Sequence, residues 1–127
     1  MVDVLFSSSF DEKYSPLNVL NNNNKLIWTS TGLYPQELIL SLDQEKLVNS
    51  LNITGYNIKK LIVESLDNEN SVTNPQRQAE MNEVSFKDGK IQDFNVDFSV
   101  KKQIKLIKII IMEGYDDFCC INSIILK

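Results

Sequence analysis

The chain contains no histidine, and its 127 residues include only two cysteines, four glycines and a single arginine. Without histidine, the Ser-His-Asp and Cys-His catalytic pairings, the usual zinc sites and the commonest general base are excluded. The four glycines are not spaced to form a phosphate-binding loop. We therefore expect a protein that is not an enzyme and needs no nucleotide.

The two cysteines, Cys119 and Cys120, are adjacent, a spacing that closes a disulfide only with strain. They open an apolar run that continues to Leu126, and free cysteine is among the most buried residue types. Core packing by reduced thiols is therefore favoured. A redox pair is the alternative, and it requires an exposed thiolate of low pKa. Asp116 and Asp117 just before them are typical of solvated loop carboxylates.

The charge balance and the apolar runs limit the classes of partner that the protein can have. Seventeen acidic residues against thirteen basic ones give a net charge of −4, which repels nucleic acid. The longest apolar stretch, 104–112, is interrupted by Lys105 and Lys108, whereas a membrane-spanning helix needs about twenty apolar residues. The N-terminal residues show no export signal. We expect a cytoplasmic protein without membrane insertion.

The length predicts one domain, 1–127, with one hydrophobic core. Short runs rich in apolar and β-branched residues are separated by Gly, Asn, Asp or charged clusters, which is the pattern of strands. Many short strands at such spacing predict an all-β sandwich or barrel. The expected strands are 2–6, 36–42, 47–54, 58–66, 83–87, 92–98, 104–112 and 118–126.

The segment 101–112 also fits a helix, because its lysines recur at helical spacing with isoleucines beside them. Five isoleucines in eight positions favour a strand, since their side chains are stiff at χ1. We predict a strand and keep the helix as the alternative.

Polar segments of the sequence predict the loops and turns that connect the strands. Residues 7–16 are expected to form a long loop, and the four asparagines at 21–24 a tight turn. Residues 67–82 are polar and contain Pro75, which predicts a loop that is either mobile or functional. Trp28, the single tryptophan, either fills the core or lines a groove, and the core is favoured.

Several motifs resemble one family. The segments 11–16, Trp28-Thr29-Ser30-Thr31-Gly32 and Tyr34-Pro35-Gln36-Glu37 resemble intraflagellar transport protein 25 homologues, also described as heat shock protein beta-11-like. Weaker similarity continues through 48–65, Lys87-Asp88-Gly89 and Tyr115-Asp116-Asp117-Phe118. The resemblance implies a discoidin-type, galactose-binding-like jelly roll. It also implies a heterodimer with a Rab-like small GTPase, other partners in ciliary transport complex B, and location in the cilium or flagellum.

Related discoidin-type domains often hold calcium, which prefers negatively charged oxygen ligands. Carried over by the resemblance, the ligand positions fall at Asn21, Leu26 and Lys127, where an amide, an alkyl group and an ammonium replace two carboxylates and a hydroxyl. We expect this degenerate site to bind calcium weakly or not at all, and we expect no other cofactor.

A strand over 104–112 has two apolar faces. Ile107, Ile109 and Ile111 share one face, and the other face carries Leu106, Lys108, Ile110 and Met112. A sandwich strand normally buries one face, so the second stripe predicts contact with a loop or with a partner protein. We take these four residues as candidates for binding the GTPase.

A carbohydrate-binding module is the alternative function, because the same fold often holds sugars on aromatic platforms. Phe10, Tyr14, Tyr34 and Tyr115 are the candidates for such a platform. The lack of an export signal and the single arginine, Arg77, count against it.

Overall fold

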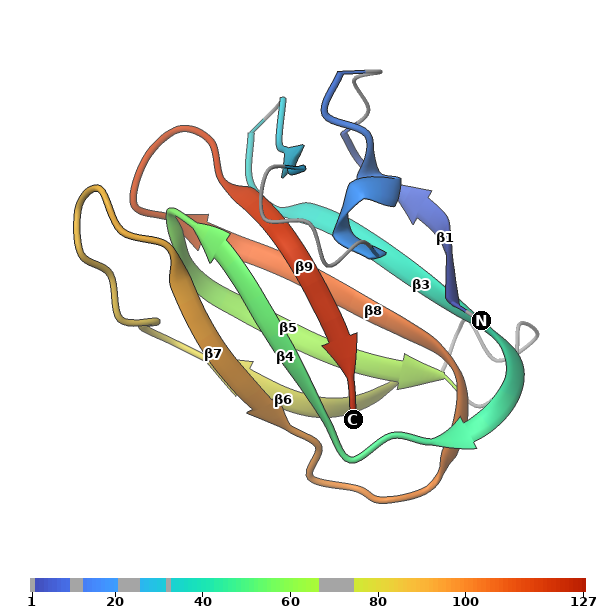
Figure 1. Cartoon of the computed structure of the whole chain (residues 1–127). Coiled ribbons are helices and arrows are strands. Elements are labelled where there is room, and N and C mark those ends of the chain that lie inside the picture. Colours follow the sequence, from blue (N-terminus) through green and yellow to red (C-terminus); the bar gives the residue numbers. More distant parts are fainter. Residues whose placement is uncertain (1, 10–12, 21–25, 32, 67–74) are drawn as a thin grey trace.

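The computed structural model of the chain describes residues 2–9, 13–20, 26–31, 33–66 and 75–127. These residues form nine strands and one short 3₁₀ helix (Figure 1). The elements are β1 (Val2–Ser7), η1 (Pro16–Leu20), β2 (Trp28–Thr29), β3 (Gln36–Leu47), β4 (Ser50–Tyr56), β5 (Ile58–Leu66), β6 (Gln76–Met81), β7 (Gln92–Asp97), β8 (Gln103–Gly114) and β9 (Cys120–Leu126).

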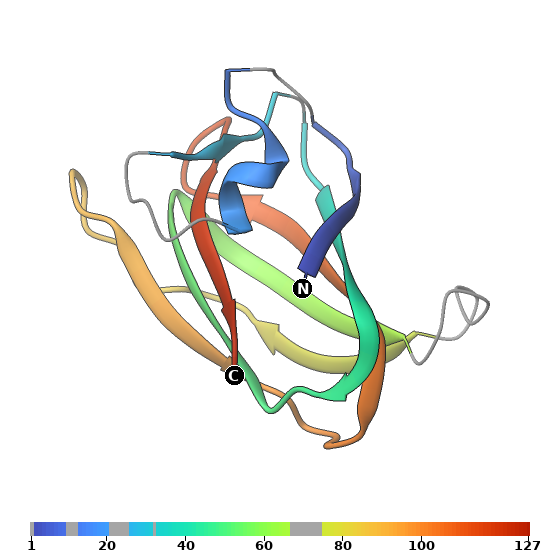
Figure 2. The same cartoon turned by 45° about the vertical axis from the view of Figure 1, so that its right-hand side comes forward.

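The strands form two antiparallel sheets, which lie face to face as separate layers (Figure 2). One sheet has five strands in the order β1-β3-β8-β5-β6, and the other has four in the order β2-β9-β4-β7. Strands far apart in sequence are thus neighbours in space, as in a jelly roll. The predicted all-β, galactose-binding-like jelly-roll sandwich is confirmed. In the part of the chain that the structure describes, no helix is long and apolar enough to span a membrane.

The β8 strand lies at the centre of the five-stranded sheet, between β3 and β5. In its register, Ile109 faces Leu38 on one side and Val63 on the other. Its side chains alternate between buried and partly exposed from Ile107 to Met112. The strand predicted for 104–112 is confirmed, and the helical alternative is wrong.

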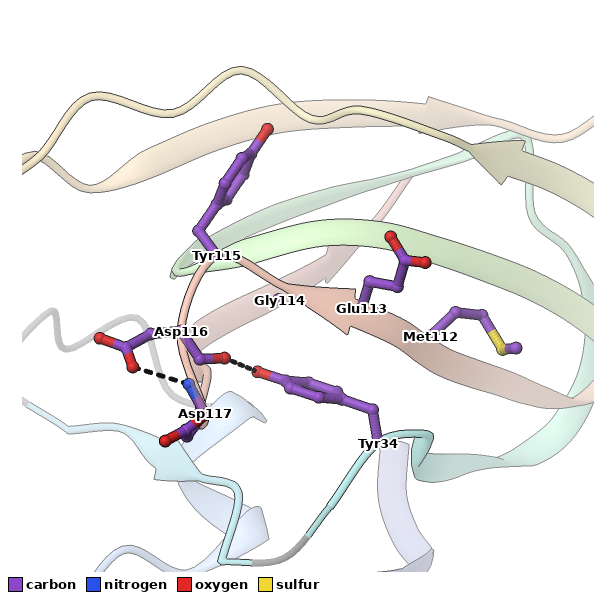
Figure 3. A pocket seen from close by; sticks show the side chains of 7 residues that line it. All are labelled: Tyr34, Met112, Glu113, Gly114, Tyr115, Asp116 and Asp117. Atoms are coloured by element: carbon purple, nitrogen blue, oxygen red, sulfur yellow. Dashed lines mark hydrogen bonds between the residues drawn. The ribbon is translucent and has the colours of Figure 1, made fainter.

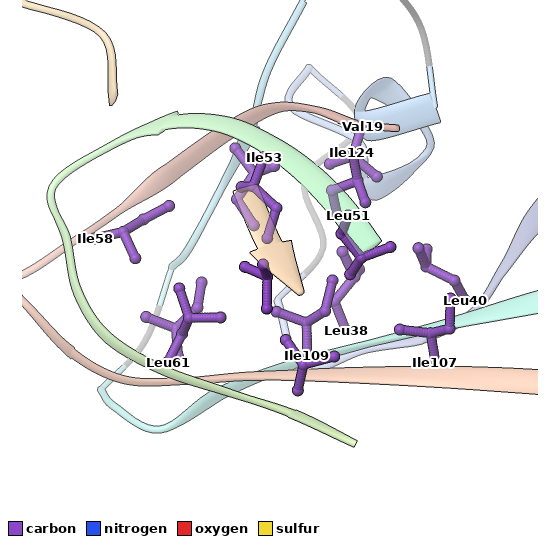
Figure 4. Packing of buried hydrophobic residues seen from close by; sticks show 14 of the residues in the cluster. Val19, Leu38, Leu40, Leu51, Ile53, Ile58, Leu61, Ile107, Ile109 and Ile124 are labelled. Atoms are coloured by element: carbon purple, nitrogen blue, oxygen red, sulfur yellow. The ribbon is translucent and has the colours of Figure 1, made fainter. Parts of the chain in front are cut away.

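The core lies between the two sheets (Figure 4). The five-stranded sheet contributes alternate residues of β3, β5 and β8, and the four-stranded sheet contributes residues of β4 and β9. Trp28 is fully buried, and its indole N–H donates to the Ser9 carbonyl at 3.0 Å. The core interpretation of the tryptophan is therefore confirmed. Val19 of η1 completes the cluster, because η1 packs against both β1 and β9.

The strand boundaries agree closely with the prediction for β1, β5, β7 and β9. The largest extension is in β3, which continues from Leu42 to Leu47 through five exposed residues. This polar extension still pairs with β8, because Leu47 faces Gln103 across a register shift. Residues 43–47 show no alternation of apolar and polar side chains, so the strand predicted from the sequence ends five residues before β3 does.

The prediction of a strand at 83–87 is wrong, and a strand lies instead within the segment 67–82 that was predicted as a loop. The β6 strand is hidden because its buried position is polar. Gln78 is 2% exposed, and its amide donates to the Ser65 hydroxyl at 3.0 Å and accepts from the Val100 N–H at 2.8 Å. Val84 is buried without being in a strand.

The sequence pattern also missed β2 and η1, which are too short to show a period. Pro16 begins η1, where its fixed φ suits the first helical position. The turn predicted at 21–24 lies outside the described residues, as do residues 67–74 of the predicted loop.

The two cysteines are free and buried, which confirms their core interpretation. Burial raises the pKa of Cys119 from about 9 to about 11, and burial also raises the pKa of Cys120. A thiol held neutral in this way is a poor nucleophile.

From the raised pKa of Cys119 we predict that the folded protein loses stability at alkaline pH. Because the folded state holds the Cys119 proton more tightly than the unfolded state, its contribution is complete below pH 9 and is lost as the pH rises through about 11. Urea titrations from pH 8 to pH 11 should show the free energy of unfolding falling by about 2 to 3 kcal/mol from this group. Cys119→Ala should flatten the slope. An unchanged slope in that variant, or rapid reaction of the native thiols with a disulfide reagent at pH 8, would contradict this account.

Candidate functional site

The outer face of the five-stranded sheet carries the residues predicted to bind a partner. Leu106, Lys108, Ile110 and Met112 occupy alternate positions of β8, opposite in direction to the buried isoleucines. Lys108, Ile110 and Met112 are partly exposed, but Leu106 is only 2% exposed. Of the four, Leu106 therefore offers almost no surface to another molecule.

Neighbouring strands widen this face into a surface. Ile110 faces Ile62 of β5, and Leu106 faces Leu66. On the other side of β8, Lys108 faces Ile39 of β3. We call this face the outer-sheet patch and define it by Ile39, Ile62, Leu106, Ile110 and Met112. Ile39, Ile110 and Met112 are partly exposed, whereas Ile62 is 7% and Leu106 2% exposed. Ile39 was not among the residues predicted from the sequence, although it lies between two leucines of the opposite face. Ile62 gave no such signal, because apolar residues flank it on both sides.

Charged side chains lie within and beside the outer-sheet patch, because Lys108 stands between Leu106 and Ile110 on β8 and faces Glu64 of β5. Lys108 Nζ lies 3.5 Å from Glu37 Oε1, which links β8 to β3. On the opposite side, Glu80 of β6 lies 3.8 Å from the Lys60 ammonium and 3.6 Å from the Arg77 guanidinium. These paired side chains are partly exposed, so solvent screening keeps their contribution to stability small. The outer-sheet patch therefore mixes apolar side chains with charged pairs, and both kinds of group occur at protein–protein interfaces.

A hollow with a volume of about 460 Å³ lies at the loop end of the sandwich (Figure 3). It is lined by Tyr34 and by the end of β8 with the loop that follows, residues 112–117. The Tyr34 hydroxyl donates to the Asp116 carbonyl at 3.0 Å, and the Asp117 N–H donates to the Asp116 carboxylate at 2.7 Å. Burial raises the pKa of Tyr34 above its ordinary value. This phenol therefore acts as a fixed donor that closes the loop.

Gly114 allows Tyr34 to approach the loop this closely. A Cβ atom at this position would collide with the Tyr34 hydroxyl and would meet the Asn57 carbonyl at 2.8 Å. The hollow thus depends on close contact between the β8 end and the segment before β3.

The predicted aromatic platform is not assembled from the described residues. Tyr115 stacks on Phe86 at 4.7 Å between ring centroids, and its hydroxyl donates to the Val84 carbonyl at 2.6 Å. The Tyr34 hydroxyl is used by Asp116. Tyr14 lies under the Lys13 ammonium at 5.5 Å, and Phe10 is outside the described residues. The tyrosines at the loop end therefore serve packing and loop closure.

The degenerate calcium positions are only partly described. Asn21 lies outside the described residues, Leu26 is 37% exposed ahead of β2, and Lys127 follows β9. The backbone of Lys127 pairs with Ser50, whereas β2 pairs with the first residues of β9. In the described ranges, no three His, Cys, Asp or Glu side chains cluster as metal ligands.

Comparison with curated proteins finds relatives that share one description. The chain is 26% identical to intraflagellar transport protein 25 of Chlamydomonas reinhardtii over 95% of its own length and 62% of the relative. It is 24% identical to the mouse homologue and 25% identical to the human one, over 96% of its length and 83% of each. The chain thus spans less than two thirds of the algal relative. No family model matches it.

Solved structures show the same architecture. CpGH89CBM32-5 of Clostridium perfringens, in complex with GalNAc-β-1,3-galactose, superposes with a TM-score of 0.82 and 15% identity over 98% of this chain and 94% of that one. The family 32 module of C. perfringens NanJ, in complex with galactose, gives 0.80 and 18% identity over 98% and 92%. At these identities the likeness concerns the fold alone. The chain is therefore similar over nearly its whole length to intraflagellar transport protein 25 homologues, and it has the galactose-binding-like fold of these solved structures.

Proposed function

We propose that this chain is a non-enzymatic subunit of the ciliary intraflagellar transport complex B. The observation that carries the proposal is its similarity to three intraflagellar transport protein 25 sequences over 95–96% of its length. The chemistry of the chain agrees with a binding role. It has no histidine, and burial raises the pKa of both thiols. Its place of action would be the cilium or flagellum and the cytoplasm.

The finer part of the proposal is a heterodimer with a Rab-like small GTPase, formed through the outer-sheet patch and Lys108. Ile110 and Met112 offer partly exposed apolar surface there, and the Glu37–Lys108 pair offers charge beside it. Burying such apolar surface would stabilise a complex by about 25 cal/mol per Å² before the costs of association. Other complex B subunits would join through the GTPase or through other faces.

Replacing Ile110 and Met112 by aspartate tests this surface. We expect the double variant to fold as the wild type does, because both side chains are partly exposed, and to lose the small GTPase in affinity purification from ciliated cells. Two desolvated carboxylates in an apolar contact should weaken binding at least a hundredfold. Mass spectrometry of the purified complexes measures the loss.

The matched control is Ile125→Asp, because Ile125 is 40% exposed on the other sheet and should leave the partner bound. Retention of the GTPase by the double variant would remove the outer-sheet patch from consideration. Absence of every complex B subunit from the wild-type sample would contradict the proposed function itself.

The solved structures of the same fold favour one alternative function for this chain, that of a carbohydrate-binding module. Two of them were solved with galactose-containing sugars, and this chain has a loop-end hollow of about 460 Å³. Against it, the Tyr34 and Tyr115 hydroxyls already bind backbone carbonyls within the chain. We expect the protein to pass unretarded through a column of immobilised galactose. Retention that free galactose reverses would favour the alternative.

We also propose that the chain folds without calcium. Lys127 places a positive charge at a position where the resemblance implies a carboxylate, and Leu26 offers no oxygen ligand. Isothermal titration at physiological salt should show no tight calcium binding, and the thermal midpoint should be the same in calcium and in chelator. A rise of several degrees on adding calcium would contradict this.

A further inference from the structure

The β1 strand forms an edge of the five-stranded sheet. It pairs with β3 on one side, and in the described part of the chain no strand pairs with its other side. An edge strand presents N–H and C=O groups that can pair with a further strand. Proteins often bind extended peptides in this way, with backbone hydrogen bonds for affinity and side-chain pockets for specificity.

One backbone group shows where an added strand would bind. Val4 faces Leu40 in the β1–β3 register, but its N–H donates to the Asp3 carboxylate at 2.8 Å. This N–H therefore points to the free side of β1. The carboxylate takes the place that the carbonyl of an incoming strand would occupy.

A groove runs along the same edge. Its volume is about 350 Å³, and it is lined by residues 3–7 of β1 together with Pro16 and Leu17 of η1. Leu5 is 56% exposed and Leu17 is 51% exposed, so both walls of the groove present apolar surface to solvent. A register shift between Val4 and Phe6 leaves Leu5 out of the β1–β3 pairing. The backbone groups and the apolar hollow thus lie side by side.

We propose that this β1-edge groove binds an extended segment of a partner protein as an additional strand of the sheet. A bulky apolar side chain of the segment would lie between Leu5 and Leu17, and a basic side chain would face Asp3. The Val4 N–H would exchange the Asp3 carboxylate for a carbonyl of the segment. The surface is distinct from the outer-sheet patch and does not rest on the transport assignment.

The negative charge of the β1 edge indicates which kind of segment binds in the β1-edge groove. Asp3 is the charged residue of β1, and the chain as a whole carries −4. A second copy would bring another Asp3 and another −4 to the same edge, whereas a basic segment neutralises the carboxylate. The preferred occupant is therefore an apolar and basic strand of a different protein.

The probe is a fluorescein-labelled peptide of eight residues in which leucine and lysine alternate, titrated with the full chain and followed by fluorescence anisotropy. Two matched peptides serve as controls, one with glutamate in place of lysine and one with N-methyl groups on the amides of one edge. Leu17→Glu tests the groove, Asp3→Asn tests the charge, and Ile91→Glu on the connection before β7 is the matched surface control. Circular dichroism checks that every variant folds.

We expect saturable binding of the lysine peptide, weakened roughly tenfold or more by Leu17→Glu and by either control peptide, and unchanged in Ile91→Glu. Asp3→Asn should reduce the preference for lysine over glutamate. Binding that survives N-methylation or Leu17→Glu would overturn the proposal, and so would the absence of saturable binding. Self-association through β1, detected by sedimentation and abolished by Leu17→Glu, would also overturn it, because the occupant would then be a second copy.

Discussion

The structure depends on the alternation of side chains along β8, the central strand of the five-stranded sheet. Because successive residues of a strand point to opposite faces, burying Ile107, Ile109 and Ile111 against the other sheet forces Ile110 and Met112 outward. Pairing with β3 and β5 on both sides then fixes which residues surround them. The core and the outer-sheet patch are thus two results of a single register. A one-residue shift would exchange them.

The same strand also positions the loop end. It ends at Gly114, where close packing against Tyr34 directs the following residues toward the segment before β3. Hydroxyl groups there donate to backbone carbonyls of the loops, and the carboxylate of Asp116 accepts from the backbone. Polar groups in this arrangement stabilise loop conformation.

The sequence predicted the parts of this fold that repeat an apolar period. The isoleucines of 104–112 predicted β8, the leucines of 36–42 predicted its neighbour β3, and the two faces of β8 followed from its isoleucines. It failed where polar side chains are buried, as Gln78 is in β6, and where an apolar residue such as Val84 is buried without a strand. The outer-sheet patch was predicted from β8 alone, because the contribution of Ile62 depends on which strands become neighbours. The β1-edge groove was not predicted, because Leu5 and Leu17 meet only in three dimensions.

Gln78 has a consequence for the whole edge of the sheet. Its side-chain amide joins Ser65 to Val100, and its backbone carbonyl accepts from the Ser99 N–H at 3.1 Å. Apolar contacts tolerate sliding, since one methyl group can substitute for another, but these directional bonds are satisfied at a single alignment. Sliding β6 along β5 would leave the buried Gln78 amide and the buried Ser65 hydroxyl without their partners. The Gln78 amide therefore fixes the alignment of β6 on β5, although most side chains of β6 are polar.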